Sequence, residues 1–481
     1  MAQHSKNLNS FYHLSEAKVK DALCQGTACF VARAQNPERW NAASAQENRL
    51  CCLGKCYHAP VSGQDQSRPI IEIHSSQPVL LQRVANGGAR TLAAYGDYAA
   101  LRRVLNQAPE AIIRAVEESG LRGRGGAGYP AGSKWRAVFE QAASLKYVVA
   151  NADEGDPGAF SDRFLMQGDP HCLIEAMLIA AHAVGASRGY IYLRKEYPEA
   201  QSVLQEALRE ARAARLLGER VLGKGFTFDI ELCMGQGSYV CGEETALLNS
   251  IEGKRPEVRA RPPYPTQEGL YGKPTLVNNV ETLMSIPWIV KQGADAYCSL
   301  GFSNSRGTKL VSLNSLFRRP GLYEVEFGIS LRTLVEEIGG GLKSGKLRGL
   351  MVGGPMAGVV PSHLLDTRFG YEELRAIGAT IGHGGIIAFD ERTSIPDLAH
   401  YLFDFGAYES CGKCTPCRLG SRELEQMFRR IQSGTQESKA AWEEILSAMH
   451  LTSLCGHGSG MAEFGLSLAR YYPEEIGKCF A

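Results

Sequence analysis

The sequence predicts a multidomain α/β protein with a helical carboxyl-terminal region. The chain has 481 residues, enough for three or four domains. Between residues 86 and 310, strand-like apolar runs alternate with helical patterns, and residues 396–481 contain four helical patterns. We therefore divide the chain into regions 1–85, 86–310, 311–395 and 396–481.

The composition excludes several classes of function. The formal net charge is +1, so there is no electrostatic argument for binding nucleic acid or a membrane surface. No apolar run reaches the roughly 18–20 residues that span a bilayer. Residues 1–14 lack an apolar core and a small-residue cleavage site, so no export signal is predicted. We expect a cytoplasmic protein without nucleic acid or direct membrane contact.

The cysteines are clustered. Of 14 in the chain, five lie between Cys24 and Cys56 and four between Cys411 and Cys455. In a reducing compartment, clustered cysteines favour metal binding over disulfides.

In the first region, Cys24 and Cys29 form a C-x4-C pair, and Cys52 and Cys56 form a C-x3-C pair. Two pairs of thiolates can hold a [2Fe–2S] cluster or a zinc ion. A scaffold without a cluster is the alternative, and Cys51 is a spare thiol.

A glycine-rich stretch, 121–135, follows helical patterns at 97–106 and 108–120. Gly125 and Gly126 let backbone amides approach a ligand closely, and Lys134 is among the cations that add positive charge. The combination suits a flat, phosphorylated ligand. The alternative, a flexible surface turn, fits poorly with the aromatic residues of this stretch.

Polar residues follow a predicted buried strand at 145–150. They are Asn151, Asp153, Glu154 and Asp156. The carboxyl edge of an open α/β sheet is where ligands bind, so these side chains are candidates for bonds to a nucleotide ligand. A solvated turn is the alternative.

Further strands are predicted at 189–193 and 226–233, with a helix at 201–217 between them. Next, Glu243 and Glu244 open an apolar helix, where the helix dipole favours carboxylates. Helix capping explains them equally well, although a flavin site would also use fixed acceptors there.

Two more features complete this region. Tyr264 follows two prolines and offers a rigid aromatic platform for a base, and Asn278 and Asn279 offer paired amides.

The third region has predicted strands at 310–316, 321–327, 350–354 and 385–389 and a helix at 331–338. No cluster of titratable residues is evident in its sequence, so we expect a structural role.

Helices are predicted at 395–404, 419–433, 437–450 and 460–471 in the last region. Cys411, Cys414 and Cys417 have C-x2-C-x2-C spacing, and Cys455 follows later. This pattern is typical of a [4Fe–4S] cluster, whose fourth thiolate comes from elsewhere. Zinc is the alternative, but zinc sites more often use two separate pairs. His457 is expected to be a neighbour of the cluster and not a ligand.

Five motifs carry a specific resemblance. They read GRGGAGYPAGSKW, NADEGDPGAFSDR, GSYVCGEETALLNSIEGKRP, RPPYPTQEGLYGKPTLVNNVET and ESCGKCTPCR. Together they resemble the FMN-binding, NADH-oxidising subunit family of respiratory NADH dehydrogenases and its soluble relatives, from residue 121 to the end of the chain. CQGTAC and CLGKCYHAP resemble a thioredoxin-like [2Fe–2S] ferredoxin domain, although only 22 residues separate Cys29 from Cys52.

The resemblance implies a fold and site roles. The regions would be a thioredoxin-like domain, a Rossmann-like α/β FMN and NAD(H) domain, a ubiquitin-like β-grasp domain, and a four-helix bundle with the [4Fe–4S] cluster. Glu244 and Asp156 would be catalytic, and Tyr129 and Tyr264 would flank the NADH base. Contacts to FMN would come from Gly125, Gly126, Lys134, Asn151, Asp153, Glu154, Gly242, Glu243, Asn278 and Asn279.

The resemblance also implies an activity. NADH would exchange a hydride with FMN, and single electrons would pass to iron–sulfur clusters. Respiratory members have Glu where this chain has Asp156, and they have Phe where it has Ala137, which resembles the soluble branch. We expect the beta subunit of an NAD-dependent formate dehydrogenase. The alternatives are the diaphorase subunit of an NAD-reducing hydrogenase, a respiratory subunit, or a flavin-free iron–sulfur relay.

The other half-reaction would then lie on partner subunits. These would be a small [2Fe–2S] subunit and a catalytic subunit with molybdenum, tungsten or nickel–iron.

Overall fold

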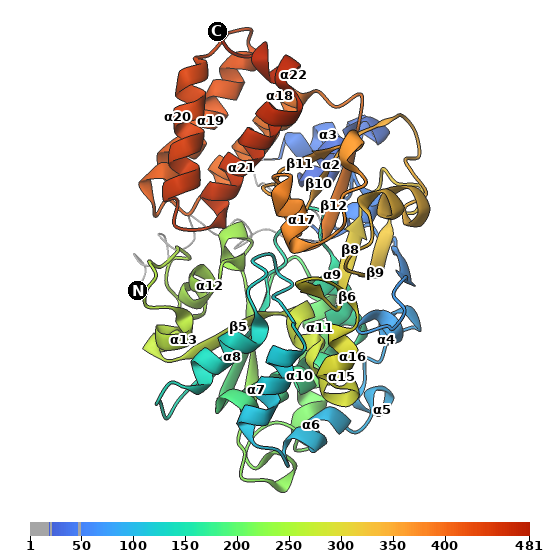
Figure 1. The fold of residues 1–481 in the computed structure, drawn as a ribbon, viewed down its shortest axis with the longest axis vertical. Helices are drawn as coiled ribbons and strands as arrows, with labels where there is room; N and C mark the ends of the chain where they lie inside the picture. The colour runs from blue at the N-terminus through green and yellow to red at the C-terminus, as the bar shows by residue number, and fades with distance from the viewer. Residues whose placement is uncertain (1–18, 20–21, 47–49) are drawn as a thin grey trace.

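The computed structural model describes residues 19, 22–46 and 50–481. The expectation about an export signal in residues 1–14 lies outside these residues. Figure 1 shows an α/β part below, a helical bundle above, and a second sheet beside the bundle. None of the described helices is both long enough and apolar enough to cross a bilayer.

The α/β part is built on a parallel sheet of four strands. Its strands are β2 (Tyr147–Ala152), β3 (Arg188–Leu193), β4 (Asp229–Met234) and β5 (Thr275–Asn279), in the order β4-β3-β2-β5. The chain moves outward from β2 to β4 and then returns to the other side of β2. The strand order therefore reverses between β2 and β5, where open α/β sheets bind ligands. The sequence had not indicated β5, because its two asparagines interrupt the apolar pattern.

Helices cover this sheet. They include α7 (Pro109–Glu118), α8 (Ala131–Phe139), α10 (Pro170–Val184) and α11 (Pro198–Ala213). All residues of α10 are buried except His182, so the apolar run there is a core helix. The helix ends at Gly185, whose φ of 74° is the left-handed conformation that favours glycine.

The second sheet has six strands. They are β1 (Ile70–Ile73), β8 (Thr308–Leu313), β9 (Gly321–Glu326), β10 (Leu347–Val352), β11 (Val359–Pro361) and β12 (Gly385–Asp390). The order is β1-β9-β8-β12-β10-β11, with parallel and antiparallel neighbours. Strand β1 comes from the predicted first region, so backbone hydrogen bonds tie that region to the third. The helix predicted at 331–338 is a π-helix over Thr333–Ile338.

The carboxyl-terminal part contains α18 (Ile395–Glu409), α19 (Thr415–Gln432), α20 (Lys439–Thr452), α21 (Gly456–Tyr471) and the short α22 (Pro473–Gly477). Ser394 and Ser438 cap α18 and α20 by accepting backbone N–H groups. Phe403, Phe428 and Trp442 meet in the centre of the bundle. Helix α19 begins four residues earlier than predicted, so Cys417 lies inside its first turn.

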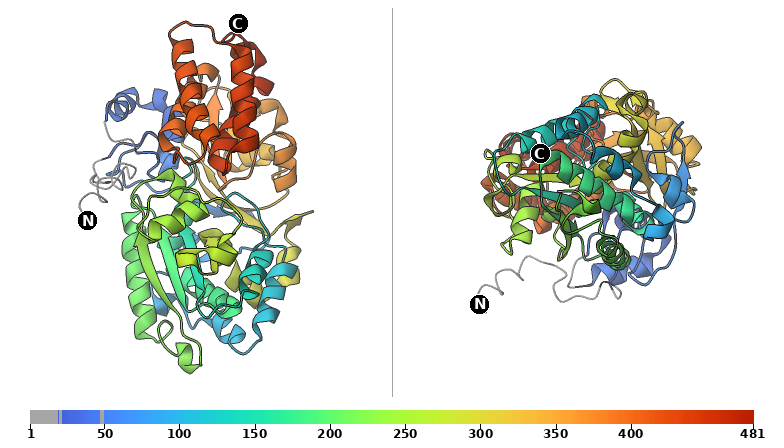
Figure 2. Two further views of the ribbon diagram at one scale, coloured as in Figure 1. Left: turned by 90° about the vertical axis from the view of Figure 1, so that its left-hand side faces the viewer. Right: turned by 90° about the horizontal axis from the view of Figure 1, so that it is seen from below.

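The amino-terminal part lies beside the bundle, where Figure 2 shows it in blue. It contains α2 (Thr27–Val31) and α3 (Pro37–Ser44), and the Phe30 ring stacks on Tyr401 of α18 at 4.2 Å. Within residues 22–46 and 50–69 the only strand-type pairing is a bridge between Leu23 and Ser62. The sheet of a thioredoxin-like fold is therefore not formed there, because too few residues separate the cysteine pairs.

The remaining α-helices and strands are α4 (Leu81–Ala85), α5 (Leu92–Tyr95), α6 (Ala99–Val104), α9 (Ser161–Gly168), α12 (Glu244–Ile251), α13 (Pro265–Glu268), α14 (Val280–Met284), α15 (Ile286–Gln292), α16 (Ala294–Cys298), α17 (Tyr371–Ala376), β6 (Gly301–Phe302) and β7 (Ser305–Arg306).

Candidate functional site

The glycine-rich loop lies on the point where the strand order reverses. A Cβ atom on Gly125 would come within 2.9 Å of the Asn279 Cβ, so only glycine lets the loop approach the end of β5 this closely. Gly126 has a φ of 126° and forms a bridge with Gly382. The loop, the ends of β2 and β5, and the segment before β12 therefore meet at one edge.

Helix α8 begins directly after this loop, and it carries Lys134, one of the cations that the sequence predicts at the site. The Lys134 Nζ donates to Glu244 Oε2 at 2.8 Å and to the Val277 carbonyl at 3.2 Å. Glu244 also pairs with Arg261 at 3.3 Å. Two cations and one carboxylate thus converge at the amino-terminal end of α12, and all three side chains are partly exposed.

The loop before α12 is fixed by Asn151. Its Nδ2 donates to the Gly242 carbonyl at 2.8 Å, and its Oδ1 accepts the Asp153 N–H at 3.1 Å. Glu243 caps α12 by accepting the N–H groups of Thr245 and Ala246, as the capping alternative predicted. Asn151 and Glu243 therefore fix the segment that joins β4 to α12.

The acidic residues after β2 have different surroundings. Glu154 is fully buried, and its carboxylate accepts bonds from Ser161, Asp162, Arg163 and Tyr197. Its side chain therefore faces the interior and not the cleft.

Asp153 has a different environment. Its Oδ2 is buried without a hydrogen-bond partner among the described residues, and burial raises the pKa of this carboxyl well above its ordinary value. The same oxygen lies 3.8 Å from the place of a Cβ on Gly242. An orphaned acceptor beside a glycine fits a hydroxyl-bearing ligand such as the ribityl chain of FMN.

Asp156 accepts a hydrogen bond of 2.6 Å from the Tyr239 hydroxyl, and Gly354 packs against its carboxyl group. Burial raises the pKa of Asp156. The Tyr239 N–H donates to the Oε2 of Glu409 at 3.0 Å, and Glu409 lies two residues before Cys411. Tyr239 therefore connects Asp156, a predicted catalytic residue, with the segment that leads to Cys411.

The two predicted base-flanking tyrosines are exposed, Tyr129 by 55% and Tyr264 by 53%. Large exposed rings next to a cleft suit stacking on a base. Each of the two asparagines of β5 already makes a side-chain hydrogen bond within the protein. Asn278 Oδ1 accepts from the Trp135 indole at 2.9 Å, and Asn279 Nδ2 donates to Asp162 at 2.6 Å.

A cluster of titratable groups joins the third region to this site. His383 Nε2 lies 2.7 Å from Asp162 Oδ2 and 3.5 Å from Glu154. Burial opposes protonation, but Asp162 and then Glu154 outweigh it and raise the pKa of His383 to about 9. The expectation that no titratable cluster involves residues 311–395 is wrong, since the partners of His383 lie more than 200 residues away.

The four cysteines of the carboxyl-terminal part line one pocket. Cys411, Cys414 and Cys417 come from the segment before α19 and its first turn, and Cys455 caps α21. Val240, next to Tyr239, lines the same pocket. Burial raises the pKa of the Cys417 thiol to about 12, so metal binding must displace its proton.

The amino-terminal cysteines also gather. Cys24, Cys29, Cys52 and Cys56 are each about 1% exposed. The Cys24 thiol contacts those of Cys29 and Cys52. The Cys52 Sγ in turn lies 3.3 Å from the Cys56 Sγ. The N–H groups of Gly26 and Gly54 point at the sulfurs of Cys24 and Cys52.

The sulfur spacing bears on the metal type. A zinc ion with bonds of about 2.3 Å draws all its sulfurs to within about 4 Å of one another. Within the part of the chain that the structure describes, one group of three metal-ligand side chains, Glu154, Asp162 and His383, has ligand atoms that all lie within 4.8 Å of one another. The cysteine sets are not among the compact groups, although Cys52 Sγ and Cys56 Sγ lie 3.3 Å apart, so the choice between zinc and iron–sulfur rests on the spacing of the cysteines in the sequence.

That compact group is not a convincing ion site itself. Each oxygen of Glu154 already accepts N–H or O–H groups, and the imidazole of His383 supplies a positive charge to Asp162. The sequence missed Tyr239, His383 and Arg194 as residues of this region. The only signal for Arg194 was its place directly after a buried strand.

Comparisons with known proteins agree with this layout. Residues 116–288 match the family described as "Nuo51 FMN-binding domain", and residues 397–479 match the "NADH-ubiquinone oxidoreductase-F iron-sulfur binding region". The first match spans the glycine-rich loop to β5, and the second contains all four cysteines of the carboxyl-terminal pocket.

Individual relatives cover most of the chain. NADP-reducing hydrogenase subunit HndC of Solidesulfovibrio fructosivorans is 45% identical over 76% of this chain and 76% of its own length. An NADH-quinone oxidoreductase F-type subunit of Rhizobium meliloti (strain 1021) is 42% identical over 80% of this chain and 93% of its own length. A chain in the crystal structure of NAD+-reducing [NiFe]-hydrogenase in the H2-reduced state has a TM-score of 0.84 and 28% identity. That likeness covers 100% of this chain and 88% of the hydrogenase chain.

Proposed function

Since the chain belongs to the family of FMN- and [4Fe–4S]-binding, NADH-oxidising subunits represented by the F-type subunits of NADH-quinone oxidoreductase, we propose that it is the diaphorase subunit of a multi-subunit, NAD-linked oxidoreductase. The chain is an NADH:acceptor oxidoreductase with FMN and a [4Fe–4S] cluster. A cytoplasmic location is part of the proposal.

The placement of Tyr239 carries the proposal. Its hydroxyl meets Asp156 in the cleft, its N–H meets Glu409, and the next residue, Val240, lines the cysteine pocket. When bound, FMN converts between the two-electron chemistry of nicotinamide and the one-electron chemistry of clusters. A single turn of chain thus separates the two cofactor regions, which favours a short path for electrons.

The chain's own residues would bind and orient the substrates. Lys134 and Arg261 hold the Glu244 carboxylate at the start of α12, and Gly125 and Gly126 let the glycine-rich loop lie against Asn279 and Gly382. Asp153 supplies a fixed acceptor for a ligand hydroxyl.

The test is chemical and direct. Acid treatment of the purified protein should release FMN, and NADH should drive the reduction of ferricyanide. Coloured protein that releases no flavin and reduces no dye would instead identify a flavin-free iron–sulfur relay.

Replacing Glu244 with glutamine should slow NADH oxidation on the order of tenfold while FMN stays bound. The substitution keeps the shape but removes the charge that Lys134 and Arg261 hold, and one charged hydrogen bond is worth about 1.5 kcal/mol or more. Steady-state kinetics and flavin content measure this. Glu268→Gln, on the exposed side of α13, is the matched control. Unchanged turnover in Glu244→Gln would remove Glu244 from the catalytic residues.

We also propose that the amino-terminal cysteines hold a [2Fe–2S] cluster. The double variant Cys24→Ser and Cys29→Ser should lose a [2Fe–2S] EPR signal and keep that of the [4Fe–4S] cluster, because the two sites use separate thiols. Cys51→Ser should keep both signals. A wild-type protein without the first signal would make this region a scaffold only.

The leading candidate for the partner's electron donor is formate; the Asp156 resemblance points to the soluble branch, which includes both formate dehydrogenases and NAD-reducing hydrogenases. Hydrogen is the second candidate, supported by the full-chain likeness to one chain of an NAD+-reducing hydrogenase. Purification of the native assembly, followed by assays of NAD+ reduction with formate or hydrogen, separates the two. The metal found in the assembly, molybdenum or tungsten against nickel, gives an independent answer.

Exposed apolar residues beside the cluster support an assembly. Leu419 is 61% exposed two residues after Cys417, and Leu454 is 40% exposed directly before Cys455. Large apolar side chains exposed around an electron exit suit a covering partner subunit.

A further inference from the structure

Arg194 connects two segments that belong to different cofactor regions. It follows β3 directly and is 2% exposed. Its Nη2 donates to the carbonyl of Cys52 at 2.6 Å, and its Nη1 donates to the carbonyl of Glu154. One guanidinium therefore bonds to the peptide of a predicted [2Fe–2S] ligand and to the loop that follows β2 at the flavin cleft.

The surrounding contacts hold the same two segments together. The Gly54 carbonyl accepts from Arg163 Nη1 at 3.0 Å. A Cβ on Gly54 would come within 2.6 Å of the Tyr197 ring, and the Tyr197 hydroxyl donates to Glu154. The cysteine loop thus packs directly on the flavin loop, with Arg194 at the centre of the contact.

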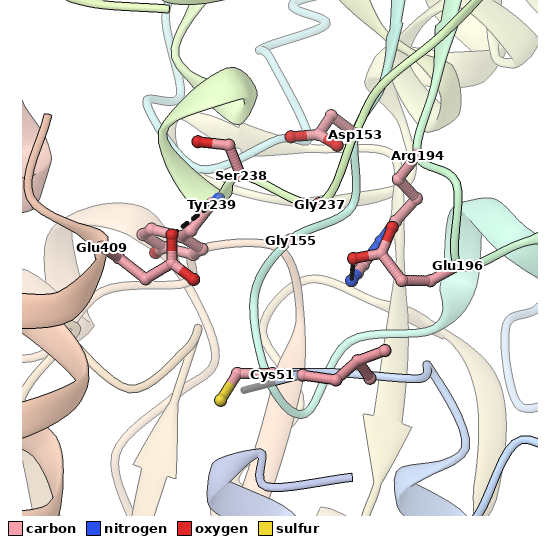
Figure 3. A pocket seen from close by; sticks show the side chains of 10 residues that line it. Cys51, Asp153, Gly155, Arg194, Glu196, Gly237, Ser238, Tyr239 and Glu409 are labelled. Atoms are coloured by element: carbon pink, nitrogen blue, oxygen red, sulfur yellow. Dashed lines mark hydrogen bonds and ion pairs between the residues drawn. The ribbon is translucent and has the colours of Figure 1, made fainter. Parts of the chain in front are cut away.

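The positive charge on Arg194 is paired with the carboxylate of Glu196. Glu196 Oε1 accepts from Arg194 Nη2 at 2.8 Å, and both side chains are nearly fully buried. Figure 3 shows this pair on one wall of a pocket, with Cys51 below and Asp153 above, and with Tyr239 and Glu409 on the opposite wall. The pair is a buried dipole whose positive end faces Cys52.

We propose that Arg194 is a positioning residue that fixes the amino-terminal cluster against the flavin loop and raises the cluster's reduction potential. The inference rests on the proposed [2Fe–2S] assignment. The step that it governs moves one electron between the reduced flavin and the cluster, with no bond made or broken. A buried positive charge favours the reduced cluster, because that state carries one more negative charge.

The test is an EPR-monitored redox titration of the complete protein. Arg194→Gln should lower the reduced-to-oxidised ratio of the [2Fe–2S] cluster at a fixed potential by about tenfold, which corresponds to about 59 mV. Glu196→Gln should shift the ratio in the opposite direction, because it removes the negative partner. Arg163→Gln is the matched control, since it removes a half-buried arginine that contacts the same cysteine loop and should change the ratio much less. The [4Fe–4S] signal and the FMN content should stay constant throughout.

The outcomes are distinct. Shifts of the same sign in Arg194→Gln and Glu196→Gln, or no shift in either, would overturn the role of Arg194 and leave the cluster assignment intact. If Arg194→Gln fails to assemble the cluster, Arg194→Lys should restore assembly and a potential near that of the wild type; otherwise the sign of the Glu196→Gln shift decides. A wild-type protein without a [2Fe–2S] signal would remove the cluster assignment and this inference together, while FMN and the [4Fe–4S] cluster remain.

Discussion

Replacing Cys417 with alanine is expected to abolish the [4Fe–4S] cluster and with it electron delivery to the partner subunits. Cys417 is one of four thiols that line a single pocket, and alanine offers no ligand. Electron delivery should fall by at least about a hundredfold, the upper end of the loss seen when only an outer partner of a metal ligand is removed. Ferricyanide reduction by NADH should survive, because a small acceptor can take electrons at the flavin. Iron content, EPR and the two assays measure the outcome.

Cys479→Ala is the matched control for this variant. Both cysteines are 5% exposed, so both substitutions remove a buried thiol of the same size, but Cys479 does not line the cluster pocket. The control should keep its iron and both activities. A Cys417→Ala protein with a full [4Fe–4S] signal would show that the ligand set is wrong.

Removing His383 is expected to lower the stability of the protein by about 3 kcal/mol at neutral pH. The interval between its ordinary pKa of 6.5 and its folded value of about 9 corresponds to that free energy. Burial works against the charged imidazole, and the carboxylates of Asp162 and Glu154 overcome it. Because the folded pKa is raised, this stability is fully present below about pH 6.5 and is lost as the pH rises through about 9. Thermal unfolding of the wild type and of His383→Gln between pH 6 and 10 measures this. The difference in stability between the two proteins should shrink as the pH rises.

Another pair of charged residues also lies next to His383. Lys309 Nζ donates to the His383 carbonyl at 3.2 Å and forms a fully buried pair with Glu281. His363→Gln, on an exposed histidine outside this cluster, should leave the pH profile unchanged. A constant difference between wild type and His383→Gln across this range would contradict the assigned charge.

The local motifs gave the sequence its predictive power. The C-x2-C-x2-C spacing places three thiols on one short segment, and such spacing depends on only a few residues. The strands at the centre of the α/β sheet were also predictable, because β2 and β3 are apolar runs that fill a core. The matches to the FMN-binding and iron–sulfur families cover residues 116–288 and 397–479, which contain these strands and this cysteine motif.

Side-chain direction was not predictable in the same way. Glu154 and Asp153 are adjacent in the sequence, yet one carboxylate is enclosed by four residues and the other has an oxygen without a partner among the described residues. Asn278 and Asn279 end β5 as expected for ligand contacts, but the Asn278 Oδ1 already accepts from Trp135 and the Asn279 Nδ2 already donates to Asp162. Whether a side chain faces a ligand depends on distant neighbours that no local pattern contains.

The sequence by itself determined which chemistry is available: two sets of thiols, a glycine loop with cations, and acidic residues after a buried strand. These features depend on residue types a few positions apart, so spacing alone reveals them. Only the tertiary structure decided how the sets are joined, through contacts such as Arg194 with Cys52 and His383 with Asp162. Those contacts close over more than a hundred residues, and their partners are set by the packing of whole elements and not by any short stretch of chain.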